Sequence, residues 1–193
     1  MATRNEGKIR EIKDLGRDLP VEFLSLEDVG PVPDVVEDGV TFEENARKKA
    51  REIARSTGMP TLADDSGLCV DALGGRPGVH SARYVSETVS DQERCAAILE
   101  EMADVSDDRR SARFVCVLVL AWPDGQETVF HGQCEGRITR ELRGTKGFGY
   151  DPIFFHEESG RTFAQMDRDS KNAVSHRGRA LRQLGEYLRH SLT

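Results

Sequence analysis

The sequence lacks any apolar run near the roughly 20 residues that would cross a membrane, and its amino terminus has no apolar stretch typical of a secretory signal. The longest apolar run, residues 114–122, suits a buried strand. A C-x-x-C pair is also missing, because the four cysteines are scattered. This spacing argues against a metal cluster or a disulfide framework and favours buried, reduced thiols. We therefore expect a cytoplasmic protein.

An excess of positive charge is absent as well, since the formal net charge of the chain is -7. Phosphate backbones and anionic membranes attract basic surfaces, so this balance argues against nucleic acid or a membrane as the main partner. A small phosphorylated ligand needs only a local basic pocket and is not excluded. The 193 residues, of which 37% are hydrophobic and 32% charged, are typical of one globular protein with a sizeable core.

The spacing of apolar residues predicts alternating helices and strands. Helices are expected at residues 6–16, from 41 to about 57, from 90 to about 102 and near 174–188, two of them behind the capping boxes Thr41-x-x-Glu44 and Ser90-x-x-Glu93. Strands are expected at residues 21–24, 61–63, 112–121, 127–134 and 153–155, and a loop at 30–39. Pro123-Asp124-Gly125 predicts a hairpin between the two longest strands. The class is α/β with a mixed sheet.

The segment Thr3-Arg4-Asn5-Glu6-Gly7-Lys8 leads into the first predicted helix. Its small and polar residues leave backbone N–H groups to face an anion, and the helix dipole adds to the attraction. The Lys8 ammonium group can reach a phosphate as a point charge. The alternative is an ordinary helix cap by Asn5 beside a solvated lysine.

Asp64-Asp65-Ser66-Gly67 follows the strand predicted at 61–63. Two carboxylates at the end of a buried strand repel each other unless a cation or a proton intervenes, and ligands of α/β sheets sit at strand ends. Such oxygen ligands suit Mg²⁺, which one or two carboxylates hold together with substrate phosphates. A plain turn remains an equal alternative, because Asp, Ser and Gly all favour turns.

Residues 144–152 interleave glycines with Phe148, Tyr150 and the acid Asp151. Such a loop can bring its backbone close to a flat ligand while an aromatic ring stacks on it, a contact worth roughly 1–3 kcal/mol per base. The alternative is a glycine-rich turn whose aromatic rings fill the core.

Three basic residues, Lys171, His176 and Arg177, come near the carboxy terminus. Arg177 offers donors in a rigid fork and His176 another, so both suit a carbonyl on a base edge, and Lys171 suits a phosphate. A solvated basic helix face is the alternative reading.

Together the segments resemble the inosine triphosphate pyrophosphatase family, also called the non-canonical purine NTP pyrophosphatase or Ham1-like family. The stretches that carry the resemblance are colinear: A-T-R-N-E-G-K (2–8), T-F-E-E-N-A (41–46), A-D-D-S-G-L (63–68), A-L-G-G-R-P-G-V-H-S-A-R-Y (72–84), G-F-G-Y-D-P-I-F (147–154) and K-N-A-V-S-H-R-G-R-A-L (171–181). They span nearly the whole chain. The resemblance implies an elongated two-lobed α/β fold with the active site in the interlobe cleft, and a homodimer.

It also implies Mg²⁺-dependent hydrolysis of dITP, ITP and XTP to the monophosphate and pyrophosphate, which removes non-standard purines from the nucleotide pool. Glu37 and Asp65 correspond to the metal-binding acids, and Asp65 to the proton acceptor. Residues 3–8, with Lys171 and Asn45 or Lys49, would cradle the triphosphate, and residues 148–151 with His176 and Arg177 would form the base pocket. The implied substrate contacts are Thr3, Arg4, Asn5, Glu6, Gly7, Lys8, Asn45, Lys49, Ser66, Phe148, Gly149, Tyr150, Asp151, Lys171, His176 and Arg177.

Members of this family carry a strand's worth of apolar residues ahead of the A-T-x-N segment, whereas only Met1 precedes it here. We expect the true start to lie upstream, with the first strand truncated from a single domain. Two other functions remain open: a pyrophosphatase for pyrimidine or modified nucleotides, and a catalytically silent nucleotide-binding protein. Pure binding has no need of a base beside the metal, so Asp65 argues against the silent protein.

Overall fold

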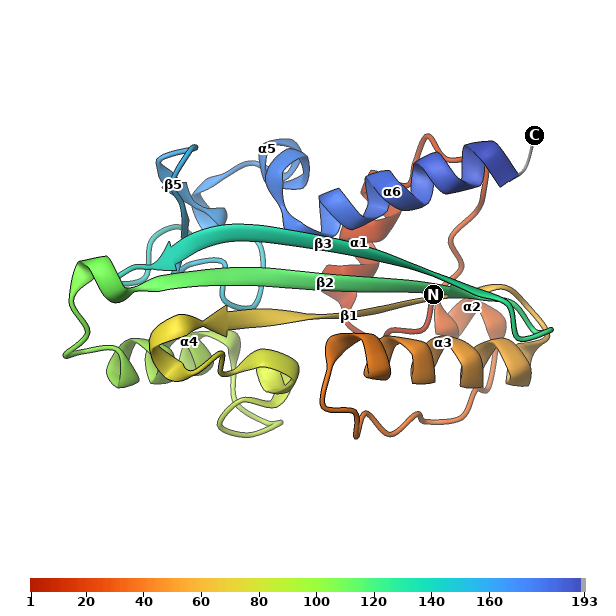
Figure 1. The fold of residues 1–193 in the computed structure, drawn as a ribbon, viewed down its shortest axis with the longest axis horizontal. Helices are drawn as coiled ribbons and strands as arrows, with labels where there is room; N and C mark the ends of the chain where they lie inside the picture. Colours follow the sequence, from red (N-terminus) through yellow and green to blue (C-terminus); the bar gives the residue numbers. More distant parts are fainter. Residues whose placement is uncertain (192–193) are drawn as a thin grey trace. The chain divides into compact units, whose positions relative to one another are not determined.

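A computed structural model describes residues 1–191 of the chain as an α/β protein (Figure 1). In chain order its elements are α1 (Glu6–Leu15), α2 (Leu26–Val29), α3 (Phe42–Thr57), β1 (Thr61–Val70), η1 (Asp71–Leu73), η2 (Gly78–Arg83), α4 (Asp91–Glu101), η3 (Asp107–Arg109), β2 (Ser111–Ala121), β3 (Glu127–Ile138), β4 (Phe154–His156), β5 (Arg161–Thr162), η4 (Phe163–Gln165), α5 (Arg168–Val174) and α6 (His176–Ser191). None of the helices in this part of the chain is long and apolar enough to cross a membrane.

The helices begin where their capping residues predict. Asn5 caps α1, and complete capping boxes open α3 at Thr41 and α4 at Ser90. Gly58 ends α3 in the left-handed conformation that glycine adopts readily. The strand predicted at residues 21–24 is wrong, because this segment has no strand conformation. A short segment with three apolar residues in four also fits a stretch that only lines a hollow, and periodicity cannot separate this case from a strand.

The sheet has five strands in the order β1-β2-β3-β4-β5. The tight turn at Asp124-Gly125 joins β2 and β3 as the predicted hairpin, with Trp122 N–H donating to Gln126 C=O at 2.9 Å. The pairs β3·β4 and β4·β5 are antiparallel, with Ile138 opposite Phe154 and Phe155 opposite Thr162. The short connection between β4 and β5 requires an antiparallel pair, whereas the longer segment between β3 and β4 would have allowed either direction. The predicted mixed sheet is not confirmed.

The described chain divides into two compact units, and β1, β2 and β3 contribute residues to both. Unit 1 comprises residues 1–65, 116–132 and 176 onward, and unit 2 comprises residues 66–115 and 133–175. The two-lobed shape, the cleft and the single-domain assignment stay predictions.

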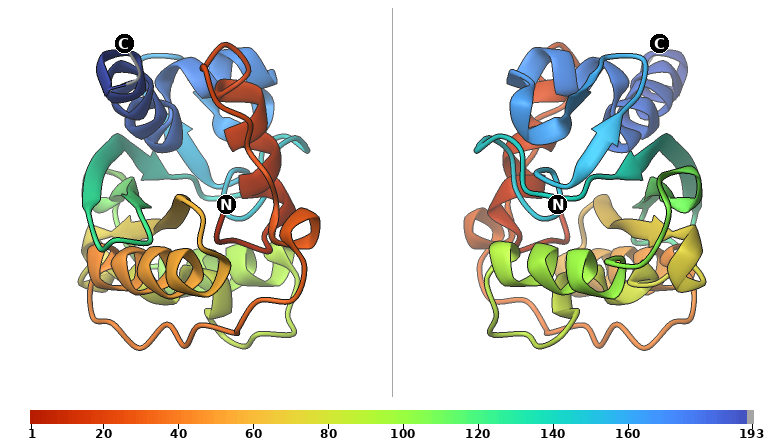
Figure 2. Two further views of the ribbon diagram at one scale, coloured as in Figure 1. Left: turned by 90° about the vertical axis from the view of Figure 1, so that its right-hand side faces the viewer. Right: turned by 90° about the vertical axis from the view of Figure 1, so that its left-hand side faces the viewer.

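In unit 1, α3 covers one face of the strands, and α1 and α6 cover the other (Figure 2). Residues 116–121 of β2 are all buried, so both faces of this strand are covered. Alternate side chains point to opposite faces of a strand. Cys116, Leu118 and Leu120 accordingly pack in one apolar cluster with Ile12 of α1 and Leu184 of α6.

An apolar hollow of about 310 Å³ lies in unit 1, lined by residues from the amino terminus, the segment 21–29, α3, β1, β2 and α6. The Met1 ammonium group donates to Leu24 C=O at 2.6 Å, and Ala2 N–H donates to Leu62 C=O at 2.8 Å. Burial lowers the pKa of the Met1 amino group. The amino-terminal residues are therefore tied both to the segment 21–24 and to β1.

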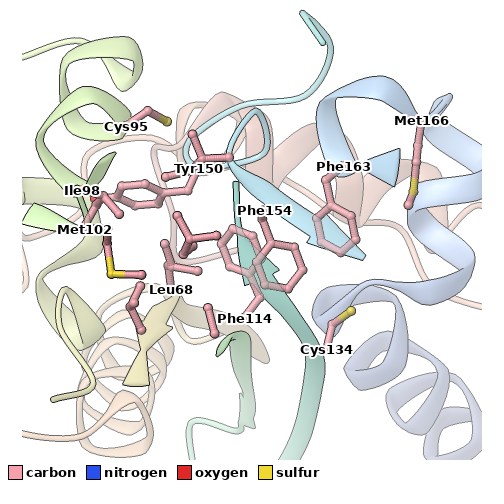
Figure 3. Packing of buried hydrophobic residues seen from close by; sticks show 14 residues of the cluster. Leu68, Cys95, Ile98, Met102, Phe114, Cys134, Tyr150, Phe154, Phe163 and Met166 are labelled. Atoms are coloured by element: carbon pink, nitrogen blue, oxygen red, sulfur yellow. The ribbon is translucent and has the colours of Figure 1, made fainter. Parts of the chain in front are cut away.

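In unit 2, α4 packs its Cys95, Ile98 and Met102 into an apolar core (Figure 3). Three phenylalanines form the centre of this core: the Phe114 ring lies 4.7 Å from Phe154 and 5.8 Å from Phe163, centroid to centroid. These aromatic contacts fix η4 and β4 against β2. The loop of residues 144–152 is thereby held between ordered elements of the same unit.

Candidate active site

Asp64 and Asp65 lie in the middle of β1, not at a strand end. The strand continues through Ser66 and Gly67 because Leu68 and Val70 are fully buried and carry it into the core of unit 2. Since neighbouring side chains of a strand point to opposite faces, the two carboxylates meet different surroundings. Both are buried, with 1% and 5% of their surface exposed. The alternative interpretation of residues 64–67 as a plain turn is therefore wrong. The pair of neighbouring acids lies within the strand instead.

Asp64 sits in a buried ion cluster. Its Oδ1 lies 2.7 Å from the Lys8 Nζ atom, and its Oδ2 accepts a hydrogen bond from Arg177 Nε at 2.8 Å. Arg177 Nη1 in turn donates to Glu11 Oε2 at 2.5 Å. Burial acts to raise the pKa of Asp64, but Arg177 and Lys8 outweigh it and hold the pKa well below its ordinary value. Asp64 is thus a permanent carboxylate.

Asp65 faces a different group, made of Lys49 and Glu37. Lys49 Nζ lies 3.2 Å from Asp65 Oδ1, 3.0 Å from Glu37 Oε2 and 3.0 Å from the backbone oxygen of Asp64. Burial, helped by the Glu37 charge, raises the pKa of Asp65 to about 6 although Lys49 and Lys8 oppose the shift. Burial acts to raise the pKa of Glu37 too, but Lys49 outweighs it and the pKa is lowered. The two neighbouring acids therefore compete for one lysine.

A divalent cation fits this pair of acids. Asp65 Oδ2 is buried and has no hydrogen-bond donor among the described residues, and two ionised carboxylates side by side cannot donate to each other. Such an orphaned oxygen is costly unless a cation or a proton satisfies it. No group of three His, Cys, Asp or Glu side chains that could hold a metal occurs within residues 1–191. Mg²⁺ does not need one, because it takes one or two carboxylates and completes its shell with water and phosphate.

The loop that carries Glu37 is fastened to α3. Asn45 is fully buried, and its Oδ1 accepts from Gly39 N–H at 2.8 Å while its Nδ2 donates to Gly39 C=O at 3.4 Å. A side chain at position 39 would bring its Cβ within 2.7 Å of Asn45 Oδ1, so only glycine permits this approach. Asn45 therefore holds the loop that positions Glu37. Its predicted phosphate contact stays a prediction.

The segment 3–8 forms the first turn of α1. Asn5 Oδ1 accepts from Lys8 N–H at 3.0 Å, as the simple helix-cap alternative predicts. The first N–H groups of a helix have no intrahelical acceptor, and Glu6 and Gly7 stand there. Lys8 is not solvated, since only 14% of its side chain is exposed and its ammonium group lies on Asp64. Asn5 is therefore an ordinary helix cap, as the alternative predicts, but Lys8 is mostly buried rather than solvated.

His176 and Arg177 open α6 and are buried, with 4% and 1% of their surface exposed. The backbone of β3 comes so close that a Cβ on Gly132 would lie 1.9 Å from His176 C=O. Both residues are therefore core residues of unit 1 rather than part of a solvated face. The predicted contacts of His176 and Arg177 with a base are not among the contacts described, and they stay predictions.

The other predicted substrate residues lie in unit 2, in and near the loop 144–152. Asp151 Oδ2 accepts from Phe148 N–H at 2.9 Å and from Lys171 Nζ at 2.5 Å. The same Nζ lies 4.8 Å from the centre of the Phe148 ring, a cation–π distance. Phe148 is half-buried, so part of its ring is accessible. This cluster offers an aromatic surface beside an acid and a lysine.

Tyr150 is buried in the core whereas Phe148 is half-buried, so Tyr150 follows the alternative interpretation in which aromatic rings of this loop fill the core. Its ring is 4% exposed and its hydroxyl donates to Ser81 C=O at 2.8 Å. Burial raises the pKa of Tyr150 above its ordinary range. Tyr150 thus anchors the loop, and the predicted contact of Tyr150 with the substrate stays a prediction.

Ser66 follows Asp65 in β1, where it is partly buried.

Sequence reasoning missed Glu11 and Cys116. Glu11 is separated from Arg177 by 166 positions, and Cys116 donates to Asp64 from β2 at 3.4 Å. Neither residue belongs to a recognisable motif. The only signal for Glu11 was an acid on the apolar face of α1, one position before Ile12.

Comparison with known proteins agrees with the α/β fold. The model of the Ham1 family matches residues 1–187. A Geobacter sulfurreducens protein named dITP/XTP pyrophosphatase is 53% identical over 97% of this chain and 94% of its own, and a Shigella flexneri protein of the same name is 50% identical over 98% and 97%. The solved structure of a Coxiella burnetii HAM1 protein has a TM-score of 0.89 at 45% identity, covering 97% of this chain and 96% of its own. The fold is that of an α/β protein with a buried acid–lysine cluster. This chain belongs to the Ham1 family.

Proposed function

We propose that this protein is a divalent-metal-dependent nucleoside triphosphate pyrophosphatase that converts dITP, ITP and XTP into the monophosphate and pyrophosphate. The observation that carries the proposal is the orphaned Asp65 Oδ2 beside Glu37, with Lys8 and Lys49 close by. Relatives about 50% identical over nearly the whole chain are named dITP/XTP pyrophosphatase, which supports the same class for this enzyme.

Glu37 and Asp65 would hold the metal, which we expect to be Mg²⁺. The bound ion supplies charge neutralisation of the polyphosphate and lowers the pKa of a coordinated water. Lys8 and Lys49 add two fixed positive charges to the same group of residues. Fixed charges that face a developing negative charge are worth more in a buried site than in water.

Asp65 is the residue that takes the proton of the attacking water in this proposal. In the metal-free protein burial and the Glu37 charge raise the pKa of Asp65 to about 6, so its carboxylate is the more basic of the two adjacent aspartates. Asp64 cannot share this task, because Lys8 and Arg177 hold it as a permanent carboxylate. Its function is to fix Lys8 and the backbone next to Asp65.

Recognition of the base is assigned to the loop 148–151 with His176 and Arg177, as in the predicted set, and Lys171 is assigned to the triphosphate. Phe148 offers a ring face for stacking. A donor that meets the 6-oxo group of hypoxanthine or xanthine is left unpaired by the 6-amino group of adenine, which discriminates strongly. The homodimer, the cytoplasmic location and the truncated first strand stay predictions of the sequence.

A panel of nucleotides tests this function. The purified protein is incubated with Mg²⁺ and dITP, XTP, dATP, dGTP, dTTP or UTP, and both products are identified. We expect dIMP and pyrophosphate from dITP, at a kcat/KM at least about a hundredfold above that for dATP. Faster turnover of dTTP or UTP would assign the pyrimidine function instead. Tight binding of dITP with no product would assign the silent nucleotide-binding function.

A further inference from the structure

The loop 144–152 owes its path to glycines in conformations that other residues avoid. Gly147 has a φ of 76° and Gly149 a φ of 60°. At Gly147 a Cβ would also lie 1.9 Å from Asp151 Oδ2, so the backbone passes directly over that carboxylate. A loop of this composition does not hold its own shape and depends on what fastens it.

Two groups fasten this loop within unit 2. On one side Asp151 accepts from Phe148 N–H and is paired with Lys171. On the other side the peptide groups of Gly149 meet α4: Asp91 Oδ2 accepts from Gly149 N–H at 2.6 Å, and Cys95 Sγ donates to Gly149 C=O at 3.4 Å. Both the N–H and the C=O group of Gly149, the residue after Phe148, are thus hydrogen-bonded to α4.

The hydrogen bonds from α4 to Gly149 hold the loop in place because the helix itself is fixed. Ser90 and Glu93 cap its first turn, and Cys95, Ile98 and Met102 are fully buried below it. Figure 3 shows Cys95, Ile98 and Met102 on α4 with the Tyr150 ring beside them. Arg94 Nη1 lies 3.1 Å from Asp91 Oδ1 and leaves Oδ2 for Gly149.

We propose that Asp91 is a positioning residue of the enzyme: by holding Gly149 N–H it sets the Phe148 ring in the arrangement that receives the purine. The inference rests on the proposed function, in which this loop binds the base. Asp91 has no contact with the acid–lysine cluster of unit 1 among the contacts described, so it acts on base binding and not on the phosphates.

Two substitutions of Asp91 separate its acceptor from its charge. Asp91→Ala removes both, whereas Asp91→Asn loses the ion pair with Arg94 and keeps an oxygen that can accept from Gly149 N–H. We expect Asp91→Ala to raise the KM for dITP by roughly five- to tenfold with kcat within about twofold of wild type, the size of one charge-assisted hydrogen bond at a half-exposed site. Asp91→Asn should restore most of the affinity.

Inorganic tripolyphosphate, which has no base, provides the second readout. Its inhibition constant should be unchanged in both variants, because the described contacts of Asp91 are with Arg94 and Gly149. Lys171, the predicted phosphate contact of this unit, is held by Asp151 instead. A parallel loss for dITP and tripolyphosphate, or a KM for Asp91→Ala equal to that of wild type, would overturn the inference while leaving the function intact. Failure of the wild-type protein to release pyrophosphate from dITP would instead remove the proposed function, and this inference with it.

Discussion

Asp64 and Asp65 are adjacent in the sequence, but their surroundings shift their pKa values in opposite directions. Lys8 and Arg177 surround Asp64 and lower its pKa, whereas burial and Glu37 raise that of Asp65 to about 6. Two carboxyl groups with separated pKa values can take different tasks in one mechanism. One acid is a structural anion and the other is free to exchange a proton.

Asp65→Asn should stabilise the metal-free protein at neutral pH. A carboxyl whose pKa is higher in the folded than in the unfolded state costs nothing below about pH 4, and its full cost is reached above about pH 6. The variant should gain about 1 to 3 kcal/mol in the free energy of unfolding at pH 8 and almost nothing at pH 4. Urea unfolding in EDTA at both pH values measures the difference.

Mg²⁺ supplies the matched control for this experiment. It should raise the stability of the wild-type protein at pH 8 and have a much smaller effect on Asp65→Asn, because the variant lacks one of the two anionic ligands. An equal gain for the variant at pH 4 and pH 8 would show that the Asp65 carboxyl is not strained by burial.

Single residues were predictable where a motif names them and not where a distant partner decides. Asp65 and Lys8 belong to recognisable stretches, and the structure brings them together in unit 1 with Lys49, which was named as an alternative to Asn45. Arg177 was expected on a base edge, yet its guanidinium contacts Asp64 and Glu11. Sequence spacing contains no information on a pairing across 166 positions.

Helix boundaries followed from local chemistry, whereas strand extents did not. Thr41 and Ser90 open their helices because a cap and its partner lie three residues apart, within one turn. β1 was expected to stop before Asp64 but continues to Val70, because burial on both sides outweighs the turn preference of Asp, Ser and Gly. The segment 21–24 shows the converse, since apolar residues there line a hollow without pairing.

The contact between β3 and the start of α6 gives a sharp test of how His176 and Arg177 are placed. Gly132→Ala would put a Cβ 1.9 Å from His176 C=O and 2.7 Å from Ala180 N, so the first turn of α6 must shift. We expect a loss of at least about 2 kcal/mol in the free energy of unfolding, together with a large loss of turnover. Urea unfolding and the pyrophosphate assay measure the two effects.

Gly185→Ala is the control in the same helix. Its Cβ would meet only the end of the flexible Leu19 side chain, at 2.8 Å. The change should therefore be within about 1 kcal/mol of wild type, with alanine favoured by its helix propensity. Equal stability of the two variants would contradict the close packing of β3 on α6.

The chain as a whole is acidic, with a net charge of -7, yet it gathers Lys8, Lys49 and Arg177 around four acids in unit 1. The absence of large polyanions among the partners therefore stays a prediction from overall charge, and the same charge leaves room for a nucleotide at this local cluster. The α/β class and the family followed from the sequence because six colinear stretches cover it. The strand directions and the ion cluster required coordinates, since both depend on contacts between distant segments.

The dependence of pyrophosphate release on Mg²⁺, measured with dITP for the wild-type protein, Glu37→Gln and Asp65→Asn, tests the metal site most directly. Wild type should be inactive in EDTA, and Glu37→Gln should need roughly tenfold more Mg²⁺ for half-maximal rate. Asp65→Asn should lose turnover by roughly a hundredfold or more, while its affinity for dITP stays within about tenfold of wild type. Full turnover in EDTA, or wild-type turnover by Asp65→Asn, would contradict a metal-bound substrate attacked with the help of Asp65.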